Sequence, residues 1–258
     1  MALAAAPGIV LITGAARRIG RAIALDLARH GWSVAIHFRN SRADAEALAT
    51  EIEAGGSRAA IVQADLANPQ ELQSLFPRCS ELIGTPNCLI NNASEFLPDT
   101  VTTASSTTWD THLDINLKAP VFLTQALALH LPNDRTGNVI NIIDQRVWKL
   151  TPDFFSYTIS KAGLWTATRT LAQSLAPRVR VNAIGPGPVL KSIHQTDDEF
   201  AGEVKSTLLG RGPTPQEIAD TVRFILNAPA MTGQMIALDG GQHLAWNEGV
   251  PIKPNDAV

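Results

Sequence analysis

The stretch around Tyr157 holds two side chains that together could move a proton. Tyr157 is the only tyrosine in the chain, and Lys161 follows it four residues later. In a helix this spacing places the phenol and the ammonium on one face. A phenol has a pKa near ~10 in water, and a neighbouring cation favours the phenolate. We therefore expect Lys161 to lower the pKa of Tyr157 and make the phenol a usable general acid. The alternative is an ordinary helix in which the lysine is solvated and the tyrosine packs.

A glycine-rich turn near the N-terminus could hold the phosphates of a dinucleotide. A short apolar run leads to Gly14, the turn ends at Gly20, and apolar residues then recur every four positions from Ile19 to Leu27. This pattern predicts a strand, a turn and a helix, and the free N–H groups at such a helix start attract a pyrophosphate. The match to the Rossmann fingerprint is imperfect, because Arg18 stands in the slot of its middle glycine.

The end of the second predicted strand indicates which nicotinamide cofactor the chain would bind. Strand 33–38 is followed by no acidic residue before Asp44, whereas a domain specific for NAD usually has an acid here for the ribose 2′-hydroxyl. Arg17, Arg39 and Ser41 could instead converge on the 2′-phosphate of NADPH. The alternative is that Arg39 is simply solvated, and that Ser41 caps the following helix in a capping box closed by Asp44.

Strand and helix patterns alternate along the chain. Apolar runs predict strands at residues 8–13, 33–38, 58–63, 87–91, 137–143, 179–184 and 234–238. Periodicity and capping residues predict helices over residues 19–30, 41–55, 69–82, 112–130, 155–175 and 215–227. The alternation predicts an α/β fold, with one Rossmann-type domain spanning 1–258 and a doubly wound parallel sheet of about seven strands flanked by helices. Ligands of such a sheet bind outside the carboxyl ends of its strands, where Asn91 and Asn92 stand.

Residues 188–212 interrupt this alternation. A short helix could begin at Asp197, but the rest of the segment has no clear period. A long insertion beside a cofactor site is often a mobile lid, so we expect these residues to form a substrate loop. The tail, residues 246–258, contains prolines and polar residues, and we expect it to be irregular or to reach a neighbouring subunit.

Composition argues against several other classes of protein. The 258 residues, 45% of them hydrophobic, can form a substantial core, and a net charge of −3 without a basic cluster argues against a nucleic-acid partner. Cys79 and Cys88 have neither zinc-binding nor disulfide-framework spacing. The histidines form no metal-ligand motif, so we predict no metal. With no signal peptide and no long apolar run, we expect a cytoplasmic protein without a membrane partner.

Five motifs in one order resemble the short-chain dehydrogenase/reductase family over residues 9–241. They are Thr13-Gly14, Asn91-Asn92-Ala93, Asn116, Tyr157-x-x-x-Lys161 and Pro186-Gly187. The resemblance implies a nicotinamide cofactor, a small-molecule substrate and a homotetramer or homodimer. It also implies a catalytic role for Asn116, whereas the residue by itself could be a locally hydrogen-bonded side chain on its helix.

Two departures from the family pattern indicate a subgroup. Asp144 stands where the family usually has a serine that holds a substrate carbonyl, and Arg18 replaces a glycine. Together with residues 92–96, these departures resemble the pteridine reductases and the bacterial dihydromonapterin reductases. That resemblance implies that Arg18 lies between the pyrophosphate and the substrate, that Phe96 stacks on a pterin ring, and that Ser94 bonds the cofactor or the pterin.

The motifs and the resemblance together predict three overlapping sets of site residues. The catalytic set is Asp144, Tyr157, Lys161 and Asn116. The cofactor-binding set is Gly14, Arg17, Arg18, Ile19, Gly20, His37, Arg39, Asn40, Ser41, Asp65, Leu66, Asn92, Ala93, Ser94, Tyr157, Lys161, Pro186 and Gly187. The substrate set is Arg18, Ser94, Phe96, Asp144 and Tyr157.

These sets predict the NADPH-dependent reduction of a dihydropterin of the dihydrobiopterin or dihydromonapterin class, with dihydrofolate as a further candidate. Reducing a C=N bond needs hydride at carbon and a proton at nitrogen, and an acid kept neutral in a water-poor pocket could donate that proton. One alternative is a short-chain carbonyl or imine reductase with another small substrate. An alternative of another class is a non-catalytic NADPH-binding sensor or scaffold.

Local alternatives also exist for three of the residues. Asp144 could merely cap a turn beside Arg146, Phe96 could belong to the core, and Trp148 could equally pack or contact substrate.

Overall fold

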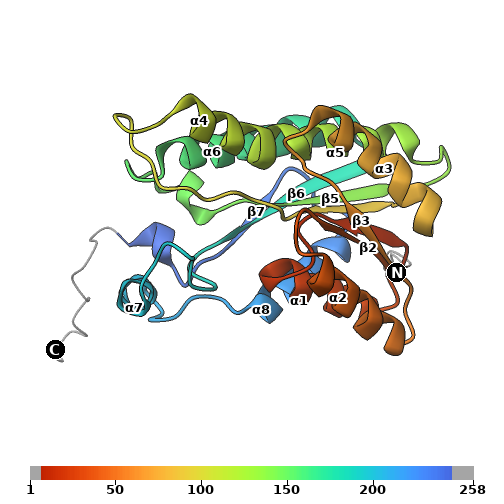
Figure 1. Cartoon of the computed structure of the whole chain (residues 1–258), viewed down its shortest axis with the longest axis horizontal. Coiled ribbons are helices and arrows are strands. Elements are labelled where there is room, and N and C mark those ends of the chain that lie inside the picture. The colour runs from red at the N-terminus through yellow and green to blue at the C-terminus, as the bar shows by residue number, and fades with distance from the viewer. Residues whose placement is uncertain (1–6, 246–258) are drawn as a thin grey trace.

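A computed structural model describes residues 7–245, which contain one parallel sheet with helices on both faces (Figure 1). The seven strands of this sheet follow the order β3-β2-β1-β4-β5-β6-β7, and every neighbouring pair is parallel. The strands are β1 Ile9–Ile12, β2 Ser33–Phe38, β3 Ala59–Gln63, β4 Cys88–Asn91, β5 Gly137–Ile142, β6 Val179–Pro186 and β7 Met235–Leu238. The predicted doubly wound α/β fold is confirmed. Its strand order reverses between β1 and β4, where a ligand crevice is expected.

Both faces of the sheet are covered, which explains why its strands are nearly continuous apolar runs. Helices α1 (Arg18–Arg29), α2 (Arg42–Ala54) and α8 (Pro215–Leu226) pack on one face (Figure 1). Helices α3 (Pro69–Ile83), α5 (Ala119–His130) and α6 (Phe155–Leu175) pack on the other. Within residues 7–245, none of the helices is long and apolar enough to cross a membrane.

Two of these helices begin with side-chain caps. The carboxamide of Asn68 accepts the backbone N–H groups of Gln70 and Glu71 at the start of α3. Thr214 and Glu217 form a reciprocal capping box at the start of α8. Each cap satisfies backbone donors that have no partner inside the helix.

The helix predicted over residues 112–130 differs most from the structure. Helix α4 (Ser106–Leu113) begins earlier, because the Ser105 hydroxyl caps it by accepting the N–H of Thr108 at 3.0 Å. A π-helical turn, η1 (Asp114–Lys118), then joins α4 to α5. Such a turn adds a residue to the helix and often marks a functional position. The run of Ser and Thr after Ser105 hid this start, because these residues have low helix propensity.

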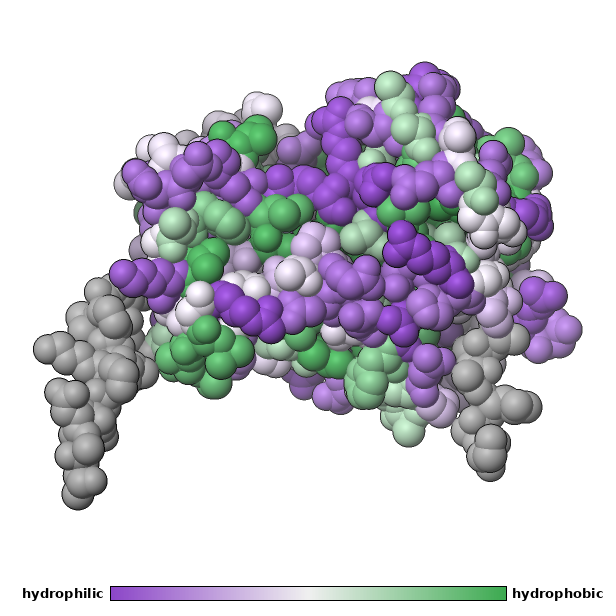
Figure 2. All heavy atoms as spheres, turned by 90° about the horizontal axis from the view of Figure 1, so that it is seen from below, coloured by the Kyte–Doolittle hydropathy of each residue, from purple (hydrophilic) through white to green (hydrophobic). Residues whose placement is uncertain are grey.

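The 188–212 segment contains the short helix expected there, α7 (Asp197–Lys205), which begins with a Thr196–Glu199 capping box. The segment leaves several apolar side chains exposed, with Ile193 at 91% and Leu209 at 71%. Viewed from below, green apolar atoms gather at the end of the molecule that carries α7 (Figure 2). The mobility of this segment stays a prediction, and the tail, residues 246–258, lies outside the described residues.

Candidate active site

Two adjoining cavities lie at the carboxyl ends of the strands. Their volumes are about 520 and 960 Å³, within the usual range for small-molecule sites. Five residues line both cavities, so the cavities share a wall: Arg18, Ile19, Asn92, Ser94 and Glu95.

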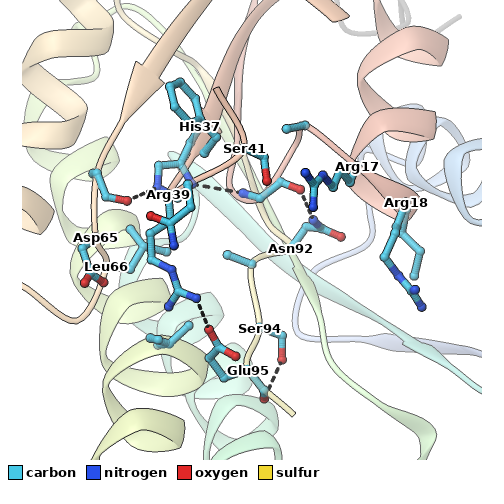
Figure 3. Close-up of a pocket in the computed structure, with 18 residues that line it drawn as sticks. Arg17, Arg18, His37, Arg39, Ser41, Asp65, Leu66, Asn92, Ser94 and Glu95 are labelled. Carbon is cyan, nitrogen blue, oxygen red and sulfur yellow. Dashed lines mark hydrogen bonds and ion pairs between the residues drawn. The ribbon is translucent and has the colours of Figure 1, made fainter. Parts of the chain in front are cut away.

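Most of the predicted cofactor-binding residues meet in the first cavity (Figure 3). They are Gly14, Arg17, Arg18, Ile19, His37, Arg39, Asn40, Ser41, Asp65, Leu66, Asn92, Ala93 and Ser94. Tyr157, Lys161, Pro186 and Gly187 line the second cavity instead. Gly20 has a packing role, because a Cβ at this position would lie 2.4 Å from the carbonyl oxygen of Gly14.

The glycine turn is fixed to the end of β4 and leaves a helix start open. The Thr13 hydroxyl accepts the N–H groups of Asn92 and Ala93 at 2.9 and 3.0 Å. In return, Asn92 Nδ2 donates to the carbonyl oxygens of Thr13 and Gly14. The side chain of the N-cap residue of α1, Arg17, makes no capping bond among the described residues, and the first turn of the helix has no acid. A helix start of this kind fits the pyrophosphate of a dinucleotide.

His37 supports this turn as a neutral side chain. Its Nδ1 accepts the N–H of Gly14 at 3.0 Å, so Nε2 carries the proton and donates to the carbonyl oxygen of Ala64 at 3.0 Å. Burial lowers the pKa of His37 to about 4. The residue therefore shapes the phosphate-binding turn but brings no positive charge to it.

Two arginines of the first cavity pair with carboxylates. Arg17 Nη2 lies 2.5 Å from Asp44 Oδ2. Arg39 Nη2 lies 2.7 Å from Glu95 Oε1, and Figure 3 shows this second pair. Exposed pairs of this kind contribute only about 0–1 kcal/mol, so an incoming phosphate can compete for either guanidinium. The capping box predicted for Ser41 is wrong, because its side chain makes no capping bond and Asp44 pairs with Arg17 instead.

Arg18 connects the glycine turn to the 188–212 segment. Its backbone φ of 54° lies in the left-handed region that favours glycine, at a cost on the order of 1 kcal/mol. Its guanidinium donates to the carbonyl oxygens of Leu190 and Lys191, both at 2.9 Å. Because Arg18 lines both cavities, it stands at the predicted border between the cofactor and substrate regions.

Tyr157 and Asp144 are in direct contact in the second cavity. The phenol donates a hydrogen bond to Asp144 Oδ2 at 2.9 Å, and Asp144 Oδ1 accepts the N–H of Arg146 at 2.8 Å. Asp144 is therefore both the cap of a short 3₁₀ helix, η2 (Gln145–Val147), and the partner of the tyrosine. Lys161 Nζ donates to the carbonyl oxygen of Ile142 at 3.0 Å and lies 5.6 Å from the centre of the Tyr157 ring.

Burial dominates the proton affinities of this trio. Burial raises the pKa of Asp144, whereas the charge of Arg146 and the hydrogen bonds from the Arg146 N–H and the Tyr157 phenol lower it. Burial and then the Asp144 charge raise the pKa of Tyr157 well above 10. Burial lowers the pKa of Lys161 to about 8. The expectation that Lys161 lowers the pKa of Tyr157 is therefore wrong, and the carboxyl is the stronger acid of the pair.

Asn116 holds the backbone of the segment that follows β4. Its Oδ1 accepts the N–H of Glu95 at 2.9 Å and the hydroxyl of Ser94 at 3.1 Å. Its Nδ2 donates to the carbonyl oxygen of Glu95 at 3.0 Å and to the Ser160 hydroxyl at 3.1 Å. The π-helical turn directs this buried amide towards the segment. Asn116 thus positions Ser94 beside the cavities and does not face them itself.

Phe96 lines the second cavity and is half-buried, so it is not a residue of the main core. Its ring stacks on Phe154 at 4.0 Å and meets the ring of Tyr157 edge-on at 4.7 Å. Trp148 packs edge-on against His243 at 5.1 Å, in line with the packing alternative.

Several side chains of the second cavity had no signal in the sequence. Phe154 stacks on Phe96, and a chain of polar groups lines the wall: Gln145 Nε2 donates to Gln242 Oε1 at 3.0 Å, and Gln242 Nε2 donates to Glu203 Oε1 at 3.3 Å. The three polar residues come from η2, α7 and a second 3₁₀ helix, η3 (Gln242–Leu244). None belongs to a motif, and only the fold brings them together.

A dinucleotide-type crevice that ends at a buried tyrosine and lysine is typical of nicotinamide-dependent oxidoreductases. The family model described as Enoyl-(Acyl carrier protein) reductase matches residues 14–243, nearly the whole chain. The chain belongs to the short-chain dehydrogenase/reductase family.

Individual similar proteins include 3-oxoacyl-[acyl-carrier-protein] reductases and FolM alternative dihydrofolate reductases. The chain is 33% identical over 238 residues to a 3-oxoacyl-[acyl-carrier-protein] reductase of Synechocystis, with 90% of this chain and 96% of the relative covered. It is also similar to the crystal structure of FolM alternative dihydrofolate reductase 1 from Brucella suis in complex with NADP, with 50% identity, a TM-score of 0.91 and 98% and 99% of the two chains covered. The corresponding Brucella canis protein, also complexed with NADP, has 48% identity and a TM-score of 0.89, with 99% and 100% covered.

Proposed function

We propose that this protein reduces a dihydropterin with NADPH as the hydride donor. The observation that carries the proposal is the buried carboxyl of Asp144, in contact with the Tyr157 phenol where related reductases usually have a serine. A serine hydroxyl can donate a hydrogen bond to the oxygen of a ketone. A protonated carboxyl suits the nitrogen of a C=N bond, which must receive a proton as hydride reaches the carbon.

NADPH is the cofactor that the first cavity fits. The N-terminus of α1 suits the pyrophosphate, and Arg17 and Arg39, which line the first cavity, would bind the 2′-phosphate. The two Brucella proteins similar to this chain were crystallised with NADP. When bound, NADPH would supply the hydride, and Lys161 would hold its ribose beside the reacting atoms.

The proton would come from the Asp144–Tyr157 pair. Burial favours the protonated carboxyl, which can donate to the substrate nitrogen. The phenol then stabilises the carboxylate by its hydrogen bond, and solvent returns the proton. Burial, the largest cause of the raised pKa of Tyr157, keeps the phenol protonated and able to donate this bond.

Phe96 would place the substrate ring. A flat apolar ring at the cavity wall suits an aromatic heterocycle, which would lie between Phe96 and the nicotinamide. Arg18 and Ser94 line the shared wall and would contact the ring or the phosphates. The candidates are dihydrobiopterin, dihydromonapterin and dihydrofolate, which carry the same ring.

A carbonyl reductase is the second candidate, and the similarity to 3-oxoacyl-[acyl-carrier-protein] reductases favours it. The oxidation of NADPH, followed by absorbance, separates the two. Turnover with 7,8-dihydrobiopterin, 7,8-dihydromonapterin or dihydrofolate supports the pterin proposal. Turnover with ketones or a 3-oxoacyl thioester, and none with any pterin, would overturn it. The predicted homotetramer or homodimer is tested separately by light scattering of the purified chain.

A further inference from the structure

Helix α6, which carries Tyr157, takes its N-terminal cap from a distant part of the chain. Its own cap position is Phe154, at φ 54°, and that side chain makes no capping bond. Asp99 supplies the cap instead: its Oδ1 accepts the N–H of Ser156 at 3.1 Å, and its carbonyl oxygen accepts the N–H of Phe155 at 3.2 Å. A carboxylate at this position stabilises the first turn of a helix.

The Asp99 cap is one end of a buried chain of hydrogen bonds. The Ser156 hydroxyl donates to Asp99 Oδ2, and His112 Nδ1 lies 2.7 Å from this hydroxyl. On the far side of the imidazole, Nε2 accepts the N–H of Leu97 at 3.0 Å. His112 and Ser156 are fully buried, and Asp99 is 6% exposed.

The direction of every bond in this chain is fixed. Burial lowers the pKa of His112, so the ring is neutral. Because Nε2 accepts from Leu97, the single ring proton is on Nδ1 and is donated to Ser156 Oγ. The serine then donates its own proton to Asp99. Since each group uses its only available donor, losing one member leaves a buried neighbour without a partner.

Two members of this chain are sequence neighbours of the two functional rings. Leu97 directly follows Phe96, and Ser156 directly precedes Tyr157, while the rings themselves touch edge-on at 4.7 Å. One helical turn further on, the Asn116–Ser160 bond connects the same segment to α6. Residues 94–99 are thus connected to α6 at two levels, through His112 of α4 and through Asn116 of η1.

We infer that Asp99, Ser156 and His112 are positioning residues of the reductase, which fix Phe96 relative to Tyr157. They thereby set the distance between a substrate ring stacked on Phe96 and the proton-donating pair. The kinetic part of this inference rests on the proposed function, because it requires a substrate on Phe96. The hydrogen-bonded chain itself does not depend on the substrate.

A double-mutant cycle tests whether His112 acts through Phe96. In His112→Leu the N–H of Leu97 loses its acceptor, and we expect kcat/KM for the dihydropterin to fall on the order of tenfold. In a Phe96→Leu background the same change should cost less than about twofold, because the ring that His112 positions is already gone. Affinity for NADPH, measured by fluorescence, should be unchanged. An equal loss in both backgrounds, or no loss in either, would overturn the inference.

Thr168→Val is the matched control for a purely structural role. Thr168 is fully buried on the same helix, donates to the carbonyl oxygen of Leu164 and accepts from Asn141 Nδ2 at 2.9 Å. Its loss should lower the unfolding temperature and leave kcat/KM within about twofold. If His112→Leu does not fold, Asp99→Asn replaces the oxygen that accepts the Ser156 hydroxyl by an NH₂ group and removes the charge of the cap, and we expect the same non-additivity with Phe96→Leu.

Hydrogen exchange separates this inference from the pterin proposal. In His112→Leu and Asp99→Asn the amides of residues 95–97 should exchange on the order of tenfold faster, with strand β5 unchanged. If the wild type reduces no pterin but the amides of residues 95–97 exchange faster in these variants, the pterin proposal fails. The inference that the hydrogen-bonded chain positions Phe96 then stands. Unchanged exchange at residues 95–97 overturns the inference whatever the activity.

Discussion

The Tyr157 phenol and the backbone N–H of Arg146 each occupy one oxygen of the Asp144 carboxyl, at 2.9 and 2.8 Å. The carboxyl is therefore held from two sides. A proton donor held in this way keeps one geometry towards the substrate, which is what efficient proton transfer requires. Burial raises the pKa of this carboxyl and so favours its protonated form, against the charge of Arg146.

The pH dependence of turnover follows from this raised pKa. Because the protonated form of Asp144 is the donor, kcat should be highest below the raised pKa and should fall as pH increases through it. A pH profile of kcat at saturating NADPH and dihydropterin checks the direction. A rate that rises with pH across the same range would identify the carboxylate form of Asp144 as the active one, which contradicts the account.

Tyr157→Phe should remove turnover and spare cofactor binding. Loss of the phenol removes the hydrogen bond that stabilises the Asp144 carboxylate after proton transfer, so kcat should fall about 10²- to 10⁴-fold. The affinity for NADPH, measured by fluorescence, should change by less than about twofold. Thr158→Val is the control, because the Thr158 hydroxyl is buried next to Tyr157 and has no hydrogen-bond partner among the described residues. A wild type that binds NADPH but turns over no substrate would instead favour the sensor or scaffold alternative.

Arg39→Ala should change the choice of cofactor. If Arg39 leaves Glu95 to bind the 2′-phosphate, its loss should lower kcat/KM for NADPH about 10- to 100-fold and hardly affect NADH. Arg42→Ala is the control, because Arg42 bonds Gln63 at 3.1 Å and lies over the Phe38 ring. Equal losses with NADPH and NADH in Arg39→Ala would place the 2′-phosphate elsewhere.

His37 should make the fold sensitive to acid. Its pKa is 6.5 when exposed and about 4 in the folded chain, so the unfolded state binds more protons between these values. Stability should therefore fall as pH decreases from 6.5 to 4, by up to about 3 kcal/mol from this residue. Urea unfolding at several pH values gives the slope of the free energy of unfolding against pH, which counts the protons taken up on unfolding. In His37→Gln this slope should correspond to about one proton fewer than in the wild type. His194→Gln, at an exposed histidine, should keep the wild-type slope, and an unchanged slope in His37→Gln would contradict the account.

The sequence was most informative where function depends on neighbours along the chain. The glycine turn, the Asn92 bonds to it and the Tyr157–Lys161 spacing are local, so their patterns predicted the sheet crevice and most of the lining of the first cavity. Asp144 and Phe96 were implied by family resemblance, and both line the second cavity.

What the sequence could not predict depends on burial and on contacts between distant segments. Lys161 was expected to lower the pKa of Tyr157, but burial and the Asp144 charge raise it instead. His37 was expected at the cofactor and lines the first cavity, but the sequence did not show that burial would make it a neutral support of Gly14. Asp99 caps a helix that begins 56 positions further along, and no spacing rule connects the two.

Substrate reduction by the wild type and by Asp144→Ser tests the central claim most directly. NADPH oxidation is followed with 7,8-dihydrobiopterin, 7,8-dihydromonapterin, dihydrofolate, simple ketones and a 3-oxoacyl thioester. The account predicts wild-type turnover with at least one dihydropterin, and a fall of about a hundredfold or more in Asp144→Ser, since a serine hydroxyl is a far weaker acid than a carboxyl. Pterin turnover that survives the substitution would remove the proton-donating role from Asp144. Turnover with ketones or the thioester alone would show that the protein is a carbonyl reductase.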